Sequence, residues 1–386
     1  MTTVSPRVLM FCGQFWPRIG GAERQALRLS NSLLARGCRV EVLTPQLEAA
    51  WALEENIDGI QVHRFPFVDL TKRITNLRGL GLLNTLVMGW QVRRAVTKYI
   101  SRFDILHAHI AWPMVAYAGE AAKSFNRKII CKVAAGGQAF DFDTLRRSSP
   151  LGPRLAQRLL AIVDTWIAIS EEIKSNIERE VSDRSRIVRI PNGVEIPVVY
   201  PVYERKVARH FLYLGRLSRT AHKDYLTLLR AFDRLVSRIP ECELKLVGGG
   251  ELTGDVHAFL QSLPHARLRT ELVGFSEPTR WLQWADVLIQ PSMAEGLSNA
   301  LLEGMAHGLV CIANDIPPNR EVLGEAGILV PVGDTETLVQ CMEKVATISS
   351  ECLKWRRGGR TRAEQVYAMD RVAEDYLRLY TMMLKG

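Results

Sequence analysis

Two carboxylates stand eight positions apart in the segment AEGLSNALLEGMAHG, residues 294–308. The apolar run 285–292 precedes them and predicts a buried strand that ends at Pro291, and a helix is expected after the turn 296–299. Glu295 and Glu303 should therefore lie at a strand-to-helix junction, on the carboxyl edge of a parallel sheet where ligands bind. Carboxylates accept hydrogen bonds from sugar hydroxyls, and a helix start offers free N–H groups to phosphate. A pair of acids at this spacing is common, so solvated surface acids remain an alternative until the surrounding sequence is considered.

Two cations follow another expected strand, in the segment GRLSRTAHKDYLTLLRAF, residues 215–232. Arg216 and Lys223 would point positive charge at the edge of the sheet. A diphosphate needs such charge both to bind and to depart. In another context the two residues would be ordinary surface cations.

Glycine turns follow several of the expected strands. Gly20 and Gly21 lie in RIGGAERQ, residues 18–25, where a chain without side chains can approach a ligand closely. The spacing is not G-x-G-x-x-G, which disfavours a nicotinamide cofactor. VGGGEL, residues 247–252, is another glycine turn after an expected strand.

Histidines and acids elsewhere give weaker signals. His107 and His109 end the expected strand in DILHAH, and a lone histidine is more often structural than catalytic. Asp141 and Asp143 form a D-x-D pair, a pattern that can bind a divalent metal. Here the pair follows a glycine loop in the N-terminal half, and no other cluster has metal-ligand spacing, so no metal is expected.

Length and composition indicate two globular domains. The chain has 386 residues, about twice the usual domain length, and its 47% hydrophobic content suffices for two cores. It has no apolar run long enough for a membrane span, and no secretory leader is inferred at its N-terminus. The seven cysteines are scattered and never spaced C-x-x-C, which is typical of buried thiols in a cytoplasmic protein.

The net charge of +9 is unevenly distributed. Residues 1–198 hold 27 Lys and Arg against 18 Asp and Glu, whereas the remaining residues hold 23 of each. Basic and large apolar residues interleave in 64–102, including Arg73, Arg78, Arg93, Arg94 and Lys98. This stretch could rest on anionic lipid, or it could be a buried helix with a solvated basic face. No nucleic-acid-binding motif accompanies it.

Strands and helices are expected to alternate, which predicts a parallel sheet in each half. Helices are expected at 21–36 and 224–238, and an amphipathic helical tail from about 361. Pro197, Pro201 and ERKVARH indicate a linker. The expected strands are 8–15, 38–44, 104–109, 128–134, 166–169, 187–190, 210–214, 244–247, 270–274, 286–290, 309–313 and 328–330.

These motifs resemble those of retaining GT-B-fold glycosyltransferases with an E-x7-E motif, the group 1 or family 4 type. The resemblance extends through LVGF (272–275), ADVLIQPS (285–292), MAHGLVCIAND (305–315) and REVLGEAGILVPVGD (320–334). It implies two Rossmann-like domains facing a cleft: residues 1–198 for the acceptor, 199–364 for the nucleotide-sugar donor, and a helix from about 365 that crosses back to the first domain.

The resemblance also implies roles for individual residues. Arg216 and Lys223 match the family's diphosphate ligands, although Asp224 replaces the usual glycine, and together with Glu295 they form the expected catalytic set. His109 is expected on the acceptor side, whereas the family's His-Gly turn is absent from KVAAGGQAFD, residues 132–141. Asn192 and Gly193 match a turn beside the cleft. The expected donor-binding residues are Gly20, Gly21, Gly215, Gly248, Gly274, Phe275, Gly296, Leu297, Ser298, Asn299 and Glu303.

The sequence thus predicts a retaining, metal-independent glycosyltransferase without a cofactor. The expected acceptor is a glycan or a lipid-linked intermediate of cell-surface polysaccharide synthesis. The expected location is the cytoplasm, with contact at the inner face of the cell membrane left open. Two alternatives share the fold: an epimerase or phosphorylase, and a catalytically silent subunit that binds sugar nucleotides. The intact set Arg216, Lys223, Glu295 and Glu303 argues against the silent subunit.

Overall fold

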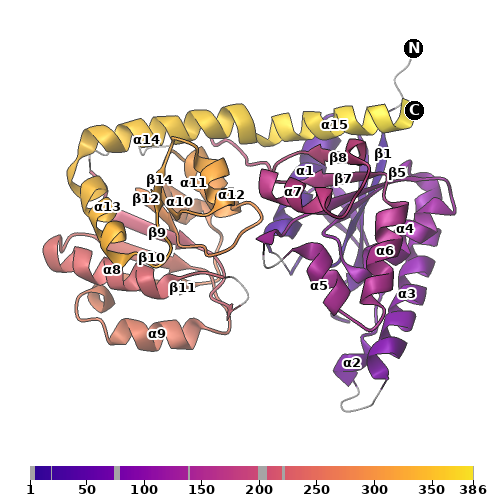
Figure 1. The fold of residues 1–386 in the computed structure, drawn as a ribbon, viewed down its shortest axis with the longest axis horizontal. Coiled ribbons are helices and arrows are strands. Elements are labelled where there is room, and N and C mark those ends of the chain that lie inside the picture. The colour runs from indigo at the N-terminus through magenta and orange to yellow at the C-terminus, as the bar shows by residue number, and fades with distance from the viewer. Residues whose placement is uncertain are drawn as a thin grey trace. The chain divides into compact units, whose positions relative to one another are not determined.

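The computed structural model describes residues 5–18, 20–73, 79–137, 140–198, 207–219 and 222–385, and it divides into two compact units. The N-terminal unit comprises residues 1–193 together with 369–386, and the C-terminal unit comprises 194–368 (Figure 1). The sequence placed the first boundary at 198/199 and the start of the returning helix near 365. In the structure the chain leaves the N-terminal unit after residue 193, a few residues before the predicted boundary. It returns to that unit at residue 369, a few residues after the predicted start of the helix.

The N-terminal unit is built on an eight-stranded sheet in the order β3-β4-β2-β1-β5-β6-β7-β8. All neighbours are parallel except β3 and β4, which form an antiparallel hairpin at one edge. The strands are β1 (Arg7–Cys12), β2 (Arg39–Gln46), β3 (Glu54–Ile57), β4 (Ile60–Pro66), β5 (Ile105–His109), β6 (Lys128–Val133), β7 (Thr165–Ala168) and β8 (Ile187–Arg189).

Helices cover both faces of this sheet, so its central strands are buried on both sides. One face packs under α1 (Gly21–Ala35) and α15 (Met369–Lys385), in a core that joins residues such as Met10, Leu29 and Tyr376. The other helices of this unit are α2 (Leu70–Arg73), α3 (Leu80–Tyr99), α4 (Pro113–Lys123), α5 (Asp141–Arg147), α6 (Gly152–Ile162) and α7 (Glu171–Glu178). Of these, α3, α4 and α6 pack side by side (Figure 1).

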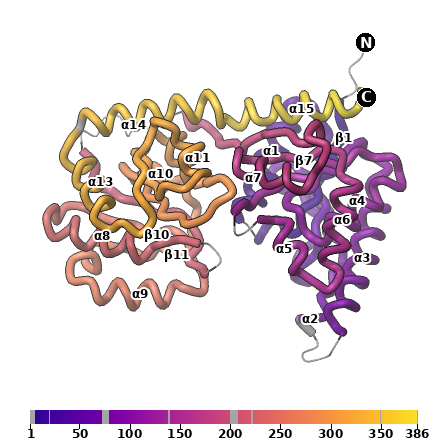
Figure 2. Tube along the Cα trace, viewed as in Figure 1, coloured from indigo at the N-terminus to yellow at the C-terminus, as the bar shows by residue number. Residues whose placement is uncertain are grey.

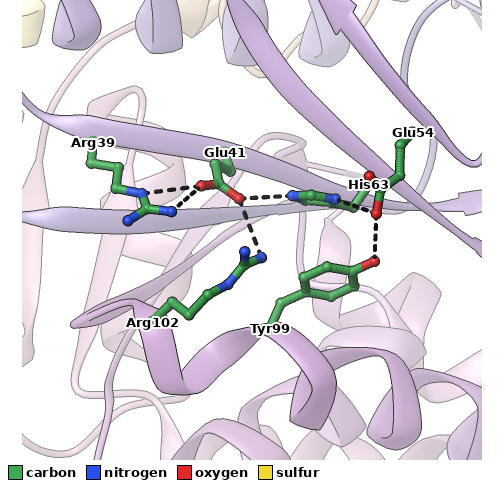
Figure 3. Close-up of polar contacts among 6 residues, drawn as sticks. All are labelled: Arg39, Glu41, Glu54, His63, Tyr99 and Arg102. Atoms are coloured by element: carbon green, nitrogen blue, oxygen red, sulfur yellow. Dashed lines mark hydrogen bonds and ion pairs between the residues drawn. The ribbon is translucent and has the colours of Figure 1, made fainter.

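The hairpin β3–β4 was not predicted, because its residues are unusually polar for buried strands. His63 and Arg64 of β4 are almost completely buried, and each is matched by acids. Figure 3 shows His63 between Glu41 and Glu54. His63 Nε2 lies 2.7 Å from Glu41 Oε2, and the His63 ring stacks on Tyr99 at a centroid distance of 4.3 Å. The Arg64 guanidinium contacts Glu55 at 2.7 Å. Burial of these two side chains is therefore compensated by ion pairs that no hydrophobic pattern reveals.

The C-terminal unit holds a six-stranded parallel sheet in the order β11-β10-β9-β12-β13-β14. Its strands are β9 (His210–Leu214), β10 (Glu243–Val247), β11 (Thr270–Gly274), β12 (Val287–Gln290), β13 (Val310–Asn314) and β14 (Ile328–Val330). Its helices are α8 (Tyr225–Arg238), α9 (Thr253–Gln261), α10 (Thr279–Trp284), α11 (Asn299–Ala306), α12 (Pro317–Leu323), α13 (Thr335–Thr347) and α14 (Ser349–Arg362). Figure 2 traces the same alternation of strand and helix along the chain.

The predicted fold class, two parallel-sheet α/β domains with a returning C-terminal helix, is confirmed. Strands β9, β11 and β14 have the predicted bounds, and α8 begins one residue later than predicted. The first strand was predicted to reach residue 15 but ends at Cys12. In each sheet the chain order reverses once, between β1 and β5 and between β9 and β12. Such reversals open a crevice at the carboxyl ends of the two strands, where ligands bind.

Candidate functional site

The strongest candidate site lies at the carboxyl ends of β9 and β12, where the C-terminal sheet reverses its order. The loop after β9 carries Arg216 and Lys223 and leads into α8. The loop after β12 carries Glu295 and leads into α11. The two segments that the sequence singled out are thus brought together, although Lys223 and Glu295 are 72 positions apart.

A short backbone pairing fixes Lys223 beside the β12 loop. Lys223 and Ser292 form an isolated antiparallel bridge, supported by Asp224 N–H donating to Pro291 O at 2.7 Å and Met293 N–H donating to His222 O at 2.8 Å. Asp224, which stands where the family has glycine, has a negative φ and caps α8 by accepting the Thr227 N–H at 3.1 Å. The departure from the family pattern therefore supplies a helix cap, and a glycine is not required.

Lys223 and Glu295 form a largely buried ion pair, with side chains 8% and 19% exposed. The Lys223 ammonium donates to Glu295 Oε1 and, at 2.7 Å, to Ser292 Oγ. The same carboxylate oxygen accepts from Ser292 Oγ at 2.8 Å and from Gln290 Nε2 at 3.1 Å. Burial by itself would raise the pKa of Glu295, but the charge and hydrogen bond of Lys223, with those of Ser292 and Gln290, lower it overall.

This network leaves particular atoms of Lys223 and Glu295 available to bind a ligand. Three donors converge on Glu295 Oε1, and the hydrogen bonds among the described residues include none to Oε2. Lys223 Nζ has three N–H groups, and the contacts to Ser292 and Glu295 account for two. One carboxylate oxygen and one ammonium N–H therefore remain for a ligand.

The start of α11 adds backbone donors beside this pair. Ser298 caps the helix by accepting the Leu301 N–H at 3.4 Å, and Leu297 is buried beneath the turn. Gly296 is buried, Asn299 opens the helix, and Glu303 lies on the following turn with only 6% of its surface exposed. The two acids of the sequence motif thus occupy different settings, one in a charged hydrogen-bond network and one buried on a helix.

Glycines let neighbouring strand ends approach closely at this edge. Gly248 has φ +137°, and a Cβ there would lie 1.9 Å from the Gly215 carbonyl oxygen. Gly248 N–H donates to Gly274 O at 2.8 Å, and Gly274 also has a positive φ, of +75°. Gly215, Gly248 and Gly274 thus form a rim of backbone at this edge, which we call the glycine rim. Arg216 and Phe275 lie next to it in the sequence and are exposed to solvent.

The sequence reasoning missed Gln290 and Ser292 as members of the site, although both stand in the quoted segment 285–292. Both are buried at the end of β12 and hold Glu295 in place. Gln290 Oε1 has no partner among the described residues, nor has Nδ2 of Asn314, at the end of the adjacent strand β13. The sequence did contain a signal for Gln290: an amide side chain ends an otherwise apolar strand. Because buried polar atoms need hydrogen-bond partners, such a residue indicates a polar site nearby.

The matching edge of the N-terminal sheet, at β1 and β5, is lined differently. A small pocket there is bordered by Cys12, Gly13, Gln14, Ala22, Glu23, His109, Ile110 and Trp112. Gly20 precedes α1 and Gly21 begins it, and Gly20 N–H donates to the Glu23 carboxylate at 2.6 Å. One N–H group that a phosphate could use is therefore already engaged by an acid of the first helical turn. Asn192 is buried in the turn before Gly193, whose backbone is held at both ends by the Gln25 amide.

Buried ionisable groups continue beneath this pocket. His107 donates to or accepts from Tyr380 at 2.7 Å and stacks on His109, and burial lowers the pKa of His107 to about 3. Burial also lowers the pKa of His109 well below the usual range, with smaller contributions from His107 and Lys132. Both imidazoles are therefore neutral at physiological pH, and His109 is suited to hydrogen bonding with a ligand and poorly suited to taking up a proton.

The D-x-D pair serves the fold of the N-terminal unit. Asp141 is buried and accepts the Ala134 N–H at 2.9 Å, whereas Asp143 lies on the exposed side of α5, within 3.4 Å of Arg146. Burial raises the pKa of Asp141 to about 7, against the lowering effect of backbone N–H groups from Ala134, Ala111 and Ala135. Among the described residues, no group of three or more His, Cys, Asp or Glu side chains could hold a metal ion.

Comparison with known proteins agrees with this architecture. Residues 19–197 match the profile of "Glycosyltransferase Family 4", and residues 208–347 match that of "Glycosyl transferases group 1". The chain belongs to this family of glycosyltransferases. The predicted glycosyltransferase family is thereby confirmed, and the enzyme is a glycosyltransferase as predicted.

Individual relatives extend over nearly the whole chain. The phosphatidyl-myo-inositol mannosyltransferase of Mycolicibacterium smegmatis is 27% identical over 87% of this chain and 83% of its own length. The O-antigen chain mannosyltransferase C of Escherichia coli is 22% identical over 98% and 99%. Anabaena HepE, solved in complex with UDP and glucose, superposes with a TM-score of 0.75 at 17% identity, covering 98% of this chain and all of its own.

The glycine rim gives a testable prediction about the C-terminal unit. We expect Gly248→Ala to lower the free energy of unfolding by more than about 1 kcal/mol, because it combines a positive φ with a steric clash. Gly254→Ala is the matched control, since a Cβ there meets nothing within 4 Å and the residue lies in α9. Urea unfolding of both variants measures the difference. Equal stabilities would show that the rim does not depend on glycine.

A second prediction concerns pH and the buried Lys132 at the end of β6. Burial lowers the pKa of Lys132 to about 7, with a small opposing effect from Cys12. Between pH 7 and the usual lysine pKa, the unfolded chain binds more protons than the folded one, so this lysine's penalty shrinks as pH rises. The stability gained by Lys132→Met should therefore fall by up to about 1.4 kcal/mol per pH unit between pH 7 and 9.

Urea unfolding at pH 7, 8 and 9 measures this difference. The matched control is Lys128→Met, which removes a half-buried lysine at the other end of the same strand. A difference between wild type and Lys132→Met that stays constant over this range would contradict the assignment.

Proposed function

We propose that this glycosyltransferase takes its sugar from a nucleoside-diphosphate sugar bound by the C-terminal unit. The supporting observation is the Lys223–Glu295 pair at the reversal of the sheet, which leaves one ammonium N–H and one carboxylate oxygen for a ligand. Lys223, Arg216 and the start of α11 suit a diphosphate, and Glu295 Oε2 suits a sugar hydroxyl. Glu303, buried on α11, is assigned to the ribose hydroxyls. The related HepE was solved with UDP and glucose, which is consistent with this class of donor.

We propose that the acceptor hydroxyl belongs to a glycan or a lipid-linked intermediate held by the N-terminal unit. The names of the relatives from M. smegmatis and E. coli point to glycolipid and cell-surface polysaccharide synthesis. His109, neutral and bordering the pocket beside Gly13, is assigned to hydrogen bonding with this acceptor. Its depressed pKa argues against a role as general base.

The proposed chemistry retains the configuration at the anomeric carbon. The bond from this carbon to the diphosphate oxygen breaks, and a bond to the acceptor oxygen forms on the same face. The acceptor's proton passes to the departing diphosphate, which serves as the base. Arg216 and Lys223 stabilise the negative charge that develops on the leaving group, which is the largest catalytic contribution available here. These cations and the helix starts take the place of a divalent metal, and no cofactor is required.

The experiment that tests this proposal follows nucleotide release from UDP-, GDP- and ADP-sugars with and without a lipid-linked acceptor. We expect one donor class to stabilise the protein against heat and to release nucleotide slowly without acceptor and faster with it. NMR of the product should show the donor's anomeric configuration, and EDTA should leave the rate unchanged. Nucleotide-sugar interconversion without transfer would indicate an epimerase, and binding without nucleotide release would indicate a silent subunit. Loss of activity in EDTA that Mn²⁺ restores would contradict metal independence.

A kinetic comparison separates the roles of the donor-binding residues. Arg216→Ala and Lys223→Ala should each lower kcat by about a hundred- to a thousand-fold, because their interaction strengthens as charge develops. Glu303→Ala should chiefly raise the KM for the donor, since the charge on the ribose does not change during the reaction. Arg219→Ala, an exposed arginine in the same loop as Arg216, is the control and should leave both constants near wild type. Near-native turnover of Arg216→Ala and Lys223→Ala at saturating donor would refute the leaving-group assignment.

A further inference from the structure

The exposed face of α3 is unusually apolar over its first half. Four large hydrophobic side chains are 42%, 50%, 53% and 61% exposed: Leu82, Leu83, Leu86 and Trp90. At 100° per residue these positions span about 100° of the helix circumference, so they form one continuous stripe. Exposed leucines are normal when scattered, but a contiguous group with a tryptophan indicates a surface that binds something.

The second half of the same face is basic. Arg93, Arg94 and Lys98 are exposed and follow the apolar stripe in the next turns of the helix. The Arg94 guanidinium lies 5.5 Å from the centre of the Trp90 ring, which joins the two halves. The sequence of α3, LGLLNTLVMGWQVRRAVTKY, contains no Asp or Glu. We call Leu82, Leu83, Leu86, Trp90, Arg94 and Lys98 the α3 face.

The opposite side of α3 is anchored in the unit. Thr85, Gly89, Val92 and Val96 are buried, and at Gly89 a Cβ would come within 2.6 Å of the Tyr117 ring on α4. The helix therefore packs closely through a small residue, and its apolar stripe lies outside that packing. Substitutions on the α3 face should for this reason leave the fold intact.

The surroundings of α3 add positive charge. Arg93 of α3 and Arg158 of α6 are each 51% exposed. Both lie beside Glu120, which is the one acid of α4. The sequence of the N-terminal unit holds 30 Lys and Arg against 20 Asp and Glu, whereas the C-terminal unit holds 20 against 21. The excess charge of the chain thus belongs to the unit that presents the apolar stripe. Arg73 and Arg78, which the sequence analysis grouped with Arg93 and Arg94, lie outside the described side chains.

We propose that the α3 face docks this enzyme onto an anionic phospholipid membrane. The stripe enters the headgroup and upper acyl region, Trp90 lies at the interface, and Arg94 and Lys98 contact lipid phosphates. This combination of large apolar side chains, interfacial tryptophan and cations without acids is complementary to an anionic bilayer surface. A helix of this kind rests on the bilayer: in the described part of the chain, no helix has the length and hydropathy needed to span one.

Co-sedimentation of the full chain with vesicles tests the proposal. We expect binding to vesicles of phosphatidylcholine mixed with phosphatidylglycerol, weakening as salt is added. Arg94→Gln with Lys98→Gln should lower the partition coefficient by roughly thirty-fold, from about five-fold per basic residue. Leu86→Ser with Trp90→Ser should lower it by at least about ten-fold, because the inserted apolar area is lost.

The matched control is Arg267→Gln with Leu268→Ser, an exposed cation and an exposed leucine of the C-terminal unit, which should bind vesicles like wild type. Nucleotide release without acceptor should be unchanged in all three variants, so this test and that of the donor site fail independently. Vesicle binding that is absent, or equal in wild type and both α3 variants, would overturn the proposal. Dimerisation lost in Leu86→Ser with Trp90→Ser, without vesicle binding by wild type, would overturn it in favour of contact between copies of this chain.

Discussion

The ion pair between Lys223 and Glu295 is the interaction on which the candidate site depends. An ammonium and a carboxylate that are mostly removed from water are costly to hold unless each finds partners, and Ser292 and Gln290 supply them here. The pair can form only because β9 and β12 are parallel neighbours whose carboxyl ends open at the same edge. The topology of the sheet therefore comes first, and the electrostatics of the site follow from it.

The pair also makes the two residues interdependent. Glu295 keeps its charge at neutral pH because Lys223 offsets the cost of burial. Loss of the lysine would therefore alter the contact proposed for the sugar as well as the one proposed for the phosphate. The glycine rim likewise makes neighbouring segments of backbone depend on each other. Gly248 lets its strand end reach the Gly215 carbonyl, and this closeness brings the Arg216 backbone to the same edge. The Lys223–Glu295 ion pair and the close contact between Gly248 and Gly215 thus both depend on strand ends that pack closely at this edge.

Much of this could be predicted from the sequence, and the limits have physical causes. Strands with hydrophobic runs, such as β9 and β14, were located from the pattern of apolar residues alone. The β3–β4 hairpin was missed because the buried His63 and Arg64 break the apolar pattern of a strand, and their pairing with Glu41 and Glu55 appears only in the folded chain. The roles of Lys223 and Glu295 were expected separately, but their pairing across 72 positions is a property of topology. Asp224 shows the reverse case, in which a residue that looked anomalous in the motif proved to be a helix cap.

The two units handle charge in opposite ways, and this difference suits the separate tasks proposed for them. In the C-terminal unit total charge is nearly balanced, and positive potential is concentrated by Lys223, Arg216 and the start of α11 at one edge. Such short-range, preorganised groups would favour the proposed diphosphate with little dependence on salt. In the N-terminal unit the histidines at the sheet edge are neutral, while the excess of basic residues includes the exposed cations of α3. Exposed charge of that kind acts over about a Debye length and is weakened by salt, which fits attraction to an extended anionic surface better than recognition of one small ligand. A pocket with neutral histidines in a basic unit suits the proposed lipid-linked acceptor, since the membrane would attract the protein and the pocket would recognise the acceptor's hydroxyl groups.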